Sequence, residues 1–232
     1  MDDQDLIPAA TVVLARDGAT GPEVLMLRRN SKIAFGGMWV FPGGRVDPAD
    51  REVDNRLLDD DREIARRAAV REANEEAGLV VDPHDLIPWS YWVPPMLPAM
   101  TMAGPRRRFS TWFFLAEAPT GEVMIDNGEI HEHLWLSPRV AMAKRDAGEI
   151  ELAPPTWITL HQLAQHQDVA SAKAFGAGLT EPPEFATRAL ATTPPSLAWR
   201  GDHAYEGADP ADLGPRNRLH LGDTGWVYEL RS

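Results

Sequence analysis

The 232-residue chain contains no cysteine. Disulfide bridges, thiolate metal sites and cysteine nucleophiles are therefore excluded, and the composition fits a reducing compartment. Long apolar runs are also lacking, because proline or charged residues interrupt each run well short of the roughly 20 residues that a membrane-spanning helix needs. The first five residues, MDDQD, are acidic, unlike the basic start of a signal peptide. We therefore expect a cytoplasmic protein without a membrane partner.

Positive charge is scarce, with 23 basic against 35 acidic residues and a formal net charge of -12. This balance argues against a nucleic acid partner. A small anionic ligand is still compatible with it, because a metal ion or a local basic patch overcomes the overall field at one site. The proportions of hydrophobic residues, 44%, and charged residues, 25%, are those of an ordinary globular protein. The sequence leaves open whether the chain forms a homodimer.

Short apolar segments rich in β-formers are separated by few helical segments, which predicts a layered α/β or α+β fold. Strands are expected at residues 9–15, 23–27, 39–41, 79–81, 89–93, 109–116 and 133–136. Helices are expected over residues 139–147 and from residue 156 onward. An extended loop over 191–215 and a closing hairpin of 216–221 with 226–230 complete the chain.

The strongest local pattern is a helix over residues 62–77, which holds no glycine or proline and is rich in alanine, arginine and glutamate. Asp60 is placed to cap its N-terminus, with Glu63 three residues later as in a capping box. Gly78 stands where a terminating glycine is expected.

One face of this helix is a stripe of small residues that runs into carboxylates. At about 100° per residue, one line along the helix collects Ala65, Ala68, Ala69, Glu72, Glu75, Glu76 and Leu79. Three carboxylates at this spacing repel one another unless a cation lies among them, and hard oxygen ligands suit Mg²⁺ or Mn²⁺. The alternative is a solvated acidic helix end whose partners are Arg66, Arg67 and Arg71.

Residues 71–79, REANEEAGL, resemble the R-E-U-x-E-E-x-G-U signature of the Nudix hydrolase family, where U is a bulky aliphatic residue. Ala73 is small for its position. The full family box is G-x5-E-x7-R-E-U-x-E-E-x-G-U, and its earlier glutamate matches Glu63, with Leu57 at the place of the glycine. The Gly44 that follows Pro42 and Gly43 lies 27 positions before Arg71, against 14 in the family, so 13 residues are inserted.

We assign that insertion to residues 45–57 and expect it to loop out at the surface, since loop-closure entropy grows slowly with length. The glycine turn then stays beside the helix. The resemblance implies an αβα sandwich with a mixed central sheet. It implies a Nudix domain over residues 8–165 and a helical and hairpin extension over 166–232, packed on the same domain.

The resemblance also implies an activity, the Mg²⁺- or Mn²⁺-dependent hydrolysis of a diphosphate bond in a nucleotide-like small molecule. Glu72, Glu75 and Glu76 resemble the metal-binding acids, one of which helps to deprotonate the attacking water. Glu63 resembles the glutamate that pairs with Arg71 to hold the helix in place.

Gly43 and Gly44 resemble the turn whose backbone approaches metal and phosphate, where a Cβ would obstruct. A non-catalytic ligand-sensing module of the same fold is the alternative from another functional class, although such modules are expected to lose metal-binding acids.

Two further pairs of residues are candidates. Arg28 and Arg108, at strand ends, are candidates for binding substrate phosphates, with solvated strand ends as the alternative. Glu129 and Glu132 precede a predicted strand, where many Nudix proteins place a further acidic ligand or base; an ordinary surface loop is the alternative.

The inserted box, with FPGGRVD at 41–47 and RRF at 107–109, resembles a branch of the family that includes the peroxisomal coenzyme A diphosphatases. Coenzyme A or an acyl-CoA is therefore the expected substrate. ADP-ribose, nucleotide sugars and modified nucleoside triphosphates stay open.

Overall fold

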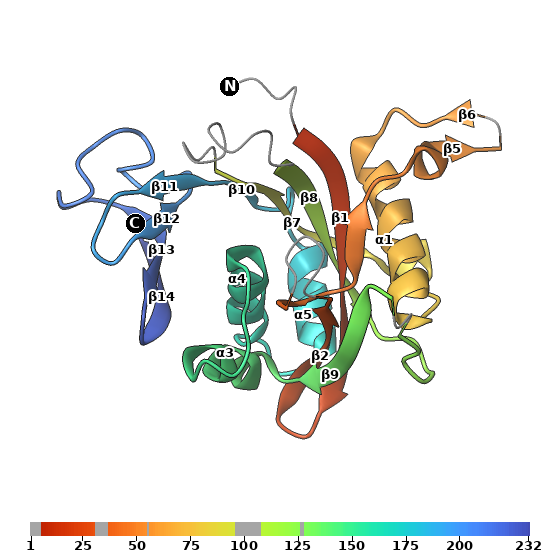
Figure 1. Ribbon diagram of the computed structural model, residues 1–232. Helices are drawn as coiled ribbons and strands as arrows, with labels where there is room; N and C mark the ends of the chain where they lie inside the picture. The colour runs from red at the N-terminus through yellow and green to blue at the C-terminus, as the bar shows by residue number, and fades with distance from the viewer. Residues whose placement is uncertain (1–5, 31–36, 55, 96–107, 126–127) are drawn as a thin grey trace.

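The computed structural model describes residues 6–30, 37–54, 56–95, 108–125 and 128–232 (Figure 1). The acidic residues 1–5 and Arg107, which entered the sequence comparison above, lie outside the described residues.

A mixed sheet of eight strands forms the centre of the molecule. Its main path runs β10-β7-β8-β1-β2-β3, with β4 paired to β1 and β9 paired to β2. The pairs β1–β8 and β10–β7 are parallel, and the other pairs are antiparallel. The strands are β1 (Leu6–Gly18), β2 (Gly21–Arg29), β3 (Trp39–Val40), β4 (Gly43–Arg45), β7 (Ile87–Val93), β8 (Arg108–Glu117), β9 (Ile130–Leu136) and β10 (Glu184–Ala186).

Helices cover both faces of this sheet. One face carries α1 (Asp61–Ala77), and the other carries α3 (Pro138–Asp146), α4 (Pro154–Leu163) and α5 (Val169–Ala177) (Figure 1). Successive strand side chains point to opposite faces, so β1 supplies both cores: Val12 and Leu14 pack on the α1 side, Val13 and Ala15 on the other. The expected αβα sandwich with a mixed central sheet is confirmed.

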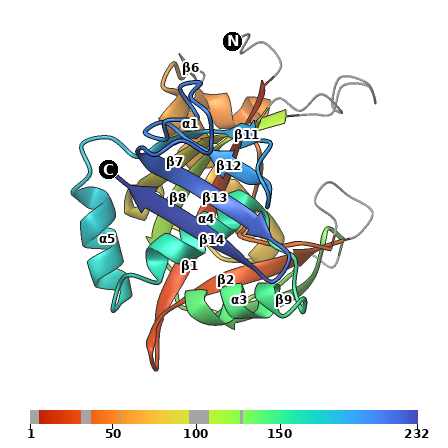
Figure 2. The ribbon, with the colours of Figure 1, turned by 90° about the vertical axis from the view of Figure 1, so that its left-hand side faces the viewer.

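A second, antiparallel sheet of four strands lies beyond α4 (Figure 2). Its order is β11 (Arg188–Leu190), β12 (Ser196–Ala198), β13 (Arg216–Gly222) and β14 (Gly225–Arg231). Aromatic contacts join it to the first sheet and its helices: Trp199 meets Trp92 edge to face at 5.7 Å, and Trp226 lies 6.3 Å from Trp157. The C-terminal region therefore shares the core of the molecule.

Between β4 and α1 the chain forms a short 3-10 helix, η2 (Pro48–Arg51), and a small hairpin of β5 (Glu52–Val53) and β6 (Arg56–Leu57). A second 3-10 helix, η3 (Pro83–Asp85), precedes β7. Leu57 is 80% exposed, so this hairpin does lie at the surface, as expected of the insertion. In the part of the chain that the structure describes, no helix is long and apolar enough to cross a membrane.

Most of the expected elements are present, including the closing hairpin. The strand expected at residues 79–81 is wrong, because these residues form no strand and have no strand partner among the described residues. The loop expected over 191–215 contains β12, and α5 lies in the extension over 166–232 that was expected to be helical, without bounds for its helix. A Cβ on Gly176 of α5 would lie 3.0 Å from Ile87 Cγ2, so the glycine allows close packing on β7.

Candidate active site

Helix α1 is fixed at both ends and along one face. The Asp60 side chain accepts hydrogen bonds from the Arg62 and Glu63 backbone N–H groups, and Gly78 ends the helix with φ 67°. The alanines of the predicted stripe are buried against the sheet, and so is Ala73. A bulkier residue at position 73 would have to displace that packing. The stripe therefore brings the carboxylates that follow it to the same sheet.

The glycine turn meets two of those carboxylates. In β4, Gly43 and Gly44 pair with Thr11 and Ala10 of β1, respectively. The Gly43 N–H donates to Glu76 Oε2 at 2.9 Å, and a Cβ on Gly44 would overlap the Glu72 carboxylate. Only glycine permits this approach. The expectation that the turn stays beside the acids despite the insertion is confirmed for Glu72 and Glu76.

Glu76 is a buried acid with an unsatisfied oxygen. The residue is 4% exposed, and Glu76 Oε1 has no hydrogen-bond partner among the described residues. Arg29 Nη2 is 3.7 Å from this oxygen, too far for a hydrogen bond. Burial raises the pKa of Glu76 to about 7, against the lowering effects of the Gly43 bond and of Arg29. A buried carboxylate in this state requires a counter-charge to stay ionised at neutral pH.

Glu72 and Glu75 have different surroundings. Burial raises the pKa of Glu72, although Arg71 Nη1 donates to its Oε1 at 2.8 Å. The Glu75 side chain is 56% exposed and accepts from the same nitrogen at 2.8 Å. Within the described ranges, no three acidic or histidine side chains are already gathered in metal-binding geometry. The structure therefore brings Glu72 and Glu76 to the glycine turn and leaves Glu75 beside Arg71.

Arg71 is held by Asp50 of η2. The Arg71 Nε and Nη2 atoms donate to the two Asp50 carboxylate oxygens at 3.2 and 2.9 Å, and Nη2 also donates to Arg45 O at 3.0 Å. Although burial opposes it, bonding to Asp50 and Glu72 raises the pKa of Arg71 above its usual range. Glu63, the expected partner, instead lies 3.3 Å from Arg66. The predicted Glu63–Arg71 pair is wrong.

A second guanidinium, that of Arg29 at the end of β2, lies on the other side of Glu76. Its Nη2 donates to Glu129 Oε2 at 2.9 Å and its Nη1 to Gly43 O at 3.5 Å. The Arg29 side chain is only 18% exposed. Glu129, one of the two further candidate acids, is thus joined to the cluster through Arg29 and adds to the field that raises the pKa of Glu76.

A NUDIX domain model matches residues 5–156. The chain belongs to the Nudix family. It is 26% identical over 164 residues to the m7GpppN-mRNA hydrolase NUDT17 of Danio rerio, a match that covers 62% of this chain and 49% of that protein. The chain thus spans about half the length of this curated relative. A solved Nudix hydrolase from Alicyclobacillus acidocaldarius is 26% identical, with a TM-score of 0.62, and the match covers 75% of this chain and 97% of that one.

The position of Asp50 corrects our alignment of the Nudix box. Asp50 stands six positions after Gly44, the spacing of the first acid in the family pattern, with aspartate in place of glutamate. Twenty residues separate Asp50 from Arg71, where the box has seven, so the 13 extra residues follow Asp50. The insertion is therefore residues 51–63 rather than 45–57, and η2 keeps Asp50 buried instead of looping out. The G-x5-D spacing was the signal that sequence reasoning missed.

Three other candidates lie apart from Glu72 and Glu76. Arg28 and Glu132 are each about half exposed and pair with one another at 3.4 Å, so Arg29 rather than Arg28 reaches the cluster. Arg108 donates to Pro94 O at 2.8 Å. It pairs with Leu6 of β1, four residues from the Ala10 that faces Gly44, or about 13 Å along the strand.

The residues at the turn fit a divalent cation. Glu76 Oε1 is an unpartnered buried oxygen, and the Glu72 carboxylate lies against the Gly44 backbone, where a Cβ at position 44 would overlap it. Carboxylate and carbonyl oxygens are the donors that Mg²⁺ and Mn²⁺ prefer. The donor set and the unsatisfied charge thus fit a divalent cation.

Proposed function

We propose that this Nudix protein hydrolyses a diphosphate bond in a nucleotide-like small molecule, using Mg²⁺ or Mn²⁺. The observation that carries the proposal is Glu76, whose unpartnered, buried oxygen lies beside the Gly43–Gly44 turn. A purely structural carboxylate would be expected to find donors for both oxygens, because unsatisfied buried polar groups are destabilising. The family membership supports the same chemistry.

Glu72, Glu76 and the Gly44 backbone are the proposed cation ligands, and Glu75 is a further one if its side chain leaves Arg71. When bound, the cation neutralises the diphosphate and lowers the pKa of a coordinated water. The chain supplies positioning: Asp50 holds Arg71, Arg71 holds Glu72, and Gly43 N–H orients Glu76.

Arg29 and Glu129 are proposed to act at the opposite side of the turn. Arg29 is the cationic side chain that lies close enough to meet a substrate phosphate beside Glu76. Glu129 is then a candidate to accept a proton from the attacking water, because a carboxylate within reach of that water is the required base. Arg28, Arg108, Glu63 and Glu132 have no place in this scheme.

Coenzyme A or an acyl-CoA is our proposed substrate, on the resemblance of the FPGGRVD segment and the inserted box. ADP-ribose, nucleotide sugars and modified nucleoside triphosphates are the alternatives. A capped dinucleotide joins them, because the curated relative is named for cap hydrolysis. The net charge of -12 favours small substrates over a long RNA.

The test is a screen of these diphosphate compounds with Mg²⁺ and with EDTA, following product masses. We expect one compound class to be cleaved at its diphosphate bond, with EDTA abolishing the reaction. Glu149→Gln, which removes an exposed carboxylate on the opposite face, is the matched control for Glu76→Gln. Tight binding of a compound without cleavage would instead favour the ligand-sensing module, and cleavage undiminished by EDTA would contradict the cation-dependent chemistry.

A further inference from the structure

A cavity of about 480 Å³ lies where the C-terminal sheet meets the edge of the first sheet. Its walls come from α4, β10, the turn after β12, β13 and β14, so every lining residue follows the segment that matches the Nudix domain. The α1 carboxylates lie on the opposite face of the first sheet (Figure 1). Cavities of roughly 300–1,000 Å³ are the size that small-molecule ligands occupy.

Two side chains on these walls carry hydrogen-bond donors that lack partners among the described residues. The Arg200 guanidinium forms no ion pair or hydrogen bond with any described residue, and its side chain is exposed at the cavity. Gln162 accepts a hydrogen bond from Trp89 Nε1 at 2.9 Å through its Oε1, which turns its amide nitrogen away from that contact. In the described part of the chain this nitrogen also has no partner. Both groups suit an acceptor-rich, anionic ligand.

The remaining walls define the rest of the ligand. Phe185, Pro183 and Leu230 provide apolar surface, and Tyr228 provides a hydroxyl whose proton goes to Asn217 Oδ1 at 2.7 Å. Glu184 also lines the cavity but forms no ion pair with Arg200 in the described residues. Its negative charge disfavours a second anionic group at that end. The expected ligand therefore has one anionic group joined to a polar or planar body.

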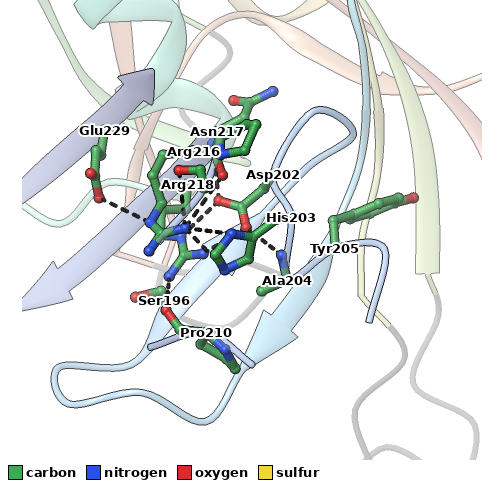
Figure 3. A network of polar contacts seen from close by, with 12 residues as sticks. Ser196, Asp202, His203, Ala204, Tyr205, Pro210, Arg216, Asn217, Arg218 and Glu229 are labelled. Atoms are coloured by element: carbon green, nitrogen blue, oxygen red, sulfur yellow. Dashed lines mark hydrogen bonds and ion pairs between the residues drawn. The ribbon is translucent and has the colours of Figure 1, made fainter. Parts of the chain in front are cut away.

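The turn that carries Arg200 is held by a fully bonded buried ion pair (Figure 3). Asp202 is completely buried and accepts from Arg218 Nε and Nη2 at 2.7 and 2.6 Å. It also accepts from the Asn217 N–H at 2.9 Å, while the Asn217 side chain donates to Arg200 O at 2.8 Å. The same residue thus ties the network to the cavity wall.

A buried ion pair adds little net stability compared with apolar packing, and its best-attested benefit is to specify one arrangement. Here the ion pair fixes the turn that carries Arg200 against β13. Gly201, with φ 91°, completes this turn. Preorganised donors lower the ordering cost of binding. We propose that this cavity is a second small-molecule site, which binds an anionic group, phosphate or carboxylate, through Arg200 and Gln162.

The site is tested by two-dimensional ¹H–¹⁵N NMR titration of the full chain in EDTA, which removes divalent cations and keeps the measurement independent of hydrolysis. The probes are inorganic phosphate, adenosine 5′-monophosphate and nicotinate, a carboxylate on an aromatic ring. The Trp89 indole N–H is the reporter, because it bonds to Gln162. We expect at least one probe to shift this signal saturably, with a Kd of about 1 mM or below.

Arg200→Gln should weaken that binding at least about tenfold, whereas Arg56→Gln, the same charge change on the exposed β6 strand, should leave it within about twofold. A response to the phosphates alone or to nicotinate alone identifies which anion the site takes. Retained amide dispersion in both variants shows that they are folded. No saturable shift up to about 10 mM, or equal binding by Arg200→Gln and wild type, would overturn the proposal.

Discussion

Two buried carboxylates in this protein, those of Asp202 and Glu76, differ in whether the fold satisfies their hydrogen bonds. Asp202, in the C-terminal layer, accepts four hydrogen bonds from Arg218, Asn217 and Ala204. Although burial works in the other direction, these bonds hold the pKa of Asp202 at about 2. Glu76 has one unpartnered oxygen, and its burial raises the pKa to about 7.

The difference separates a structural acid from one that requires a further partner. Asp202 is ionised and satisfied within the fold, so nothing has to bind there. The charge of Glu76 is balanced only in part, by Arg29 at 3.7 Å and by the Gly43 N–H. A cation at the glycine turn would complete the pairing, which is why we place the proposed site there.

The largest expected effect is on catalysis. Glu76→Gln keeps the shape of the side chain but removes the charge that would bind the cation, so kcat should fall about a thousandfold, equivalent to roughly 4 kcal/mol. Steady-state kinetics on the substrate found in the screen measure this effect. Glu149→Gln should stay close to wild type. A loss of less than about threefold in Glu76→Gln would show that Glu76 is not a ligand.

The matching change in the other region should act on stability instead. Asp202→Asn leaves Arg218 buried without its counter-ion, which should lower the free energy of unfolding by about 3–5 kcal/mol. Urea denaturation measures this loss, with the exposed Asp223→Asn as control. The kcat of Asp202→Asn, calculated per folded molecule, should equal that of wild type. A loss below about 1 kcal/mol would contradict the structural role given to this pair.

The pH dependence of stability should also separate the two acids. The folded pKa of Glu76, about 7, lies above the ordinary value of 4.5 for a glutamate, so its ionisation destabilises the fold. The loss of unfolding free energy caused by this ionisation is absent below about pH 4.5 and complete above about pH 7. A glutamine at position 76 does not ionise, so the variant has no such loss. Without divalent cations, Glu76→Gln should therefore be more stable than wild type at pH 8, by up to ~3 kcal/mol, and equal to it in acid.

For Asp202 the sign is reversed. Its folded pKa is below its unfolded value, so its contribution to stability is present above that value and is lost as the pH falls toward 2. Urea titrations of wild type and both variants from about pH 2 to about pH 8 would test the contrast, because the Asp202 contribution is lost only below its unfolded pKa. Equal pH profiles for Glu76→Gln and wild type would contradict the raised pKa.

A smaller effect is expected from the residue that positions Arg71. Asp50→Asn weakens the pairing to Arg71 without touching the proposed ligands, so kcat should fall about tenfold while KM changes little. Glu63→Gln, a change to the exposed acid beside Arg66, should alter kcat by less than about twofold. Asp50→Glu should recover part of the loss. A larger loss of kcat in Glu63→Gln than in Asp50→Asn would instead support Glu63 as the first acid of the Nudix box.

The predictable parts of this site are those fixed by short-range pattern. Helix α1, its Asp60 cap and the Glu72–Glu76 face follow from spacing within a few turns. The glycine turn follows from the FPGG segment, because only residues without a Cβ permit its approach to Glu72.

The parts that escaped prediction depend on long-range register. Asp50 has the family spacing from Gly44, whereas Glu63 has the family spacing from Arg71. Only the fold shows which acid reaches Arg71. Arg28 and Arg29 are neighbours that point to different surroundings, and a register shift between them against β9 resets the strand alternation. Strands β11 and β12 span only three residues each, and β12 pairs with β13 from farther along the chain, so no local period marks them.

The most direct test of the contrast between the two acids is calorimetric titration of Mn²⁺ into the metal-free protein near pH 7, in buffers of different ionisation enthalpy. We predict saturable binding to wild type with release of about half a proton, because a group with a pKa of about 7 is half protonated there. Glu76→Gln should bind at least about tenfold more weakly and release less of a proton than wild type, while Asp202→Asn, where folded, should bind like wild type. Wild-type affinity and proton release in Glu76→Gln would contradict the assignment of Glu76 to a cation site.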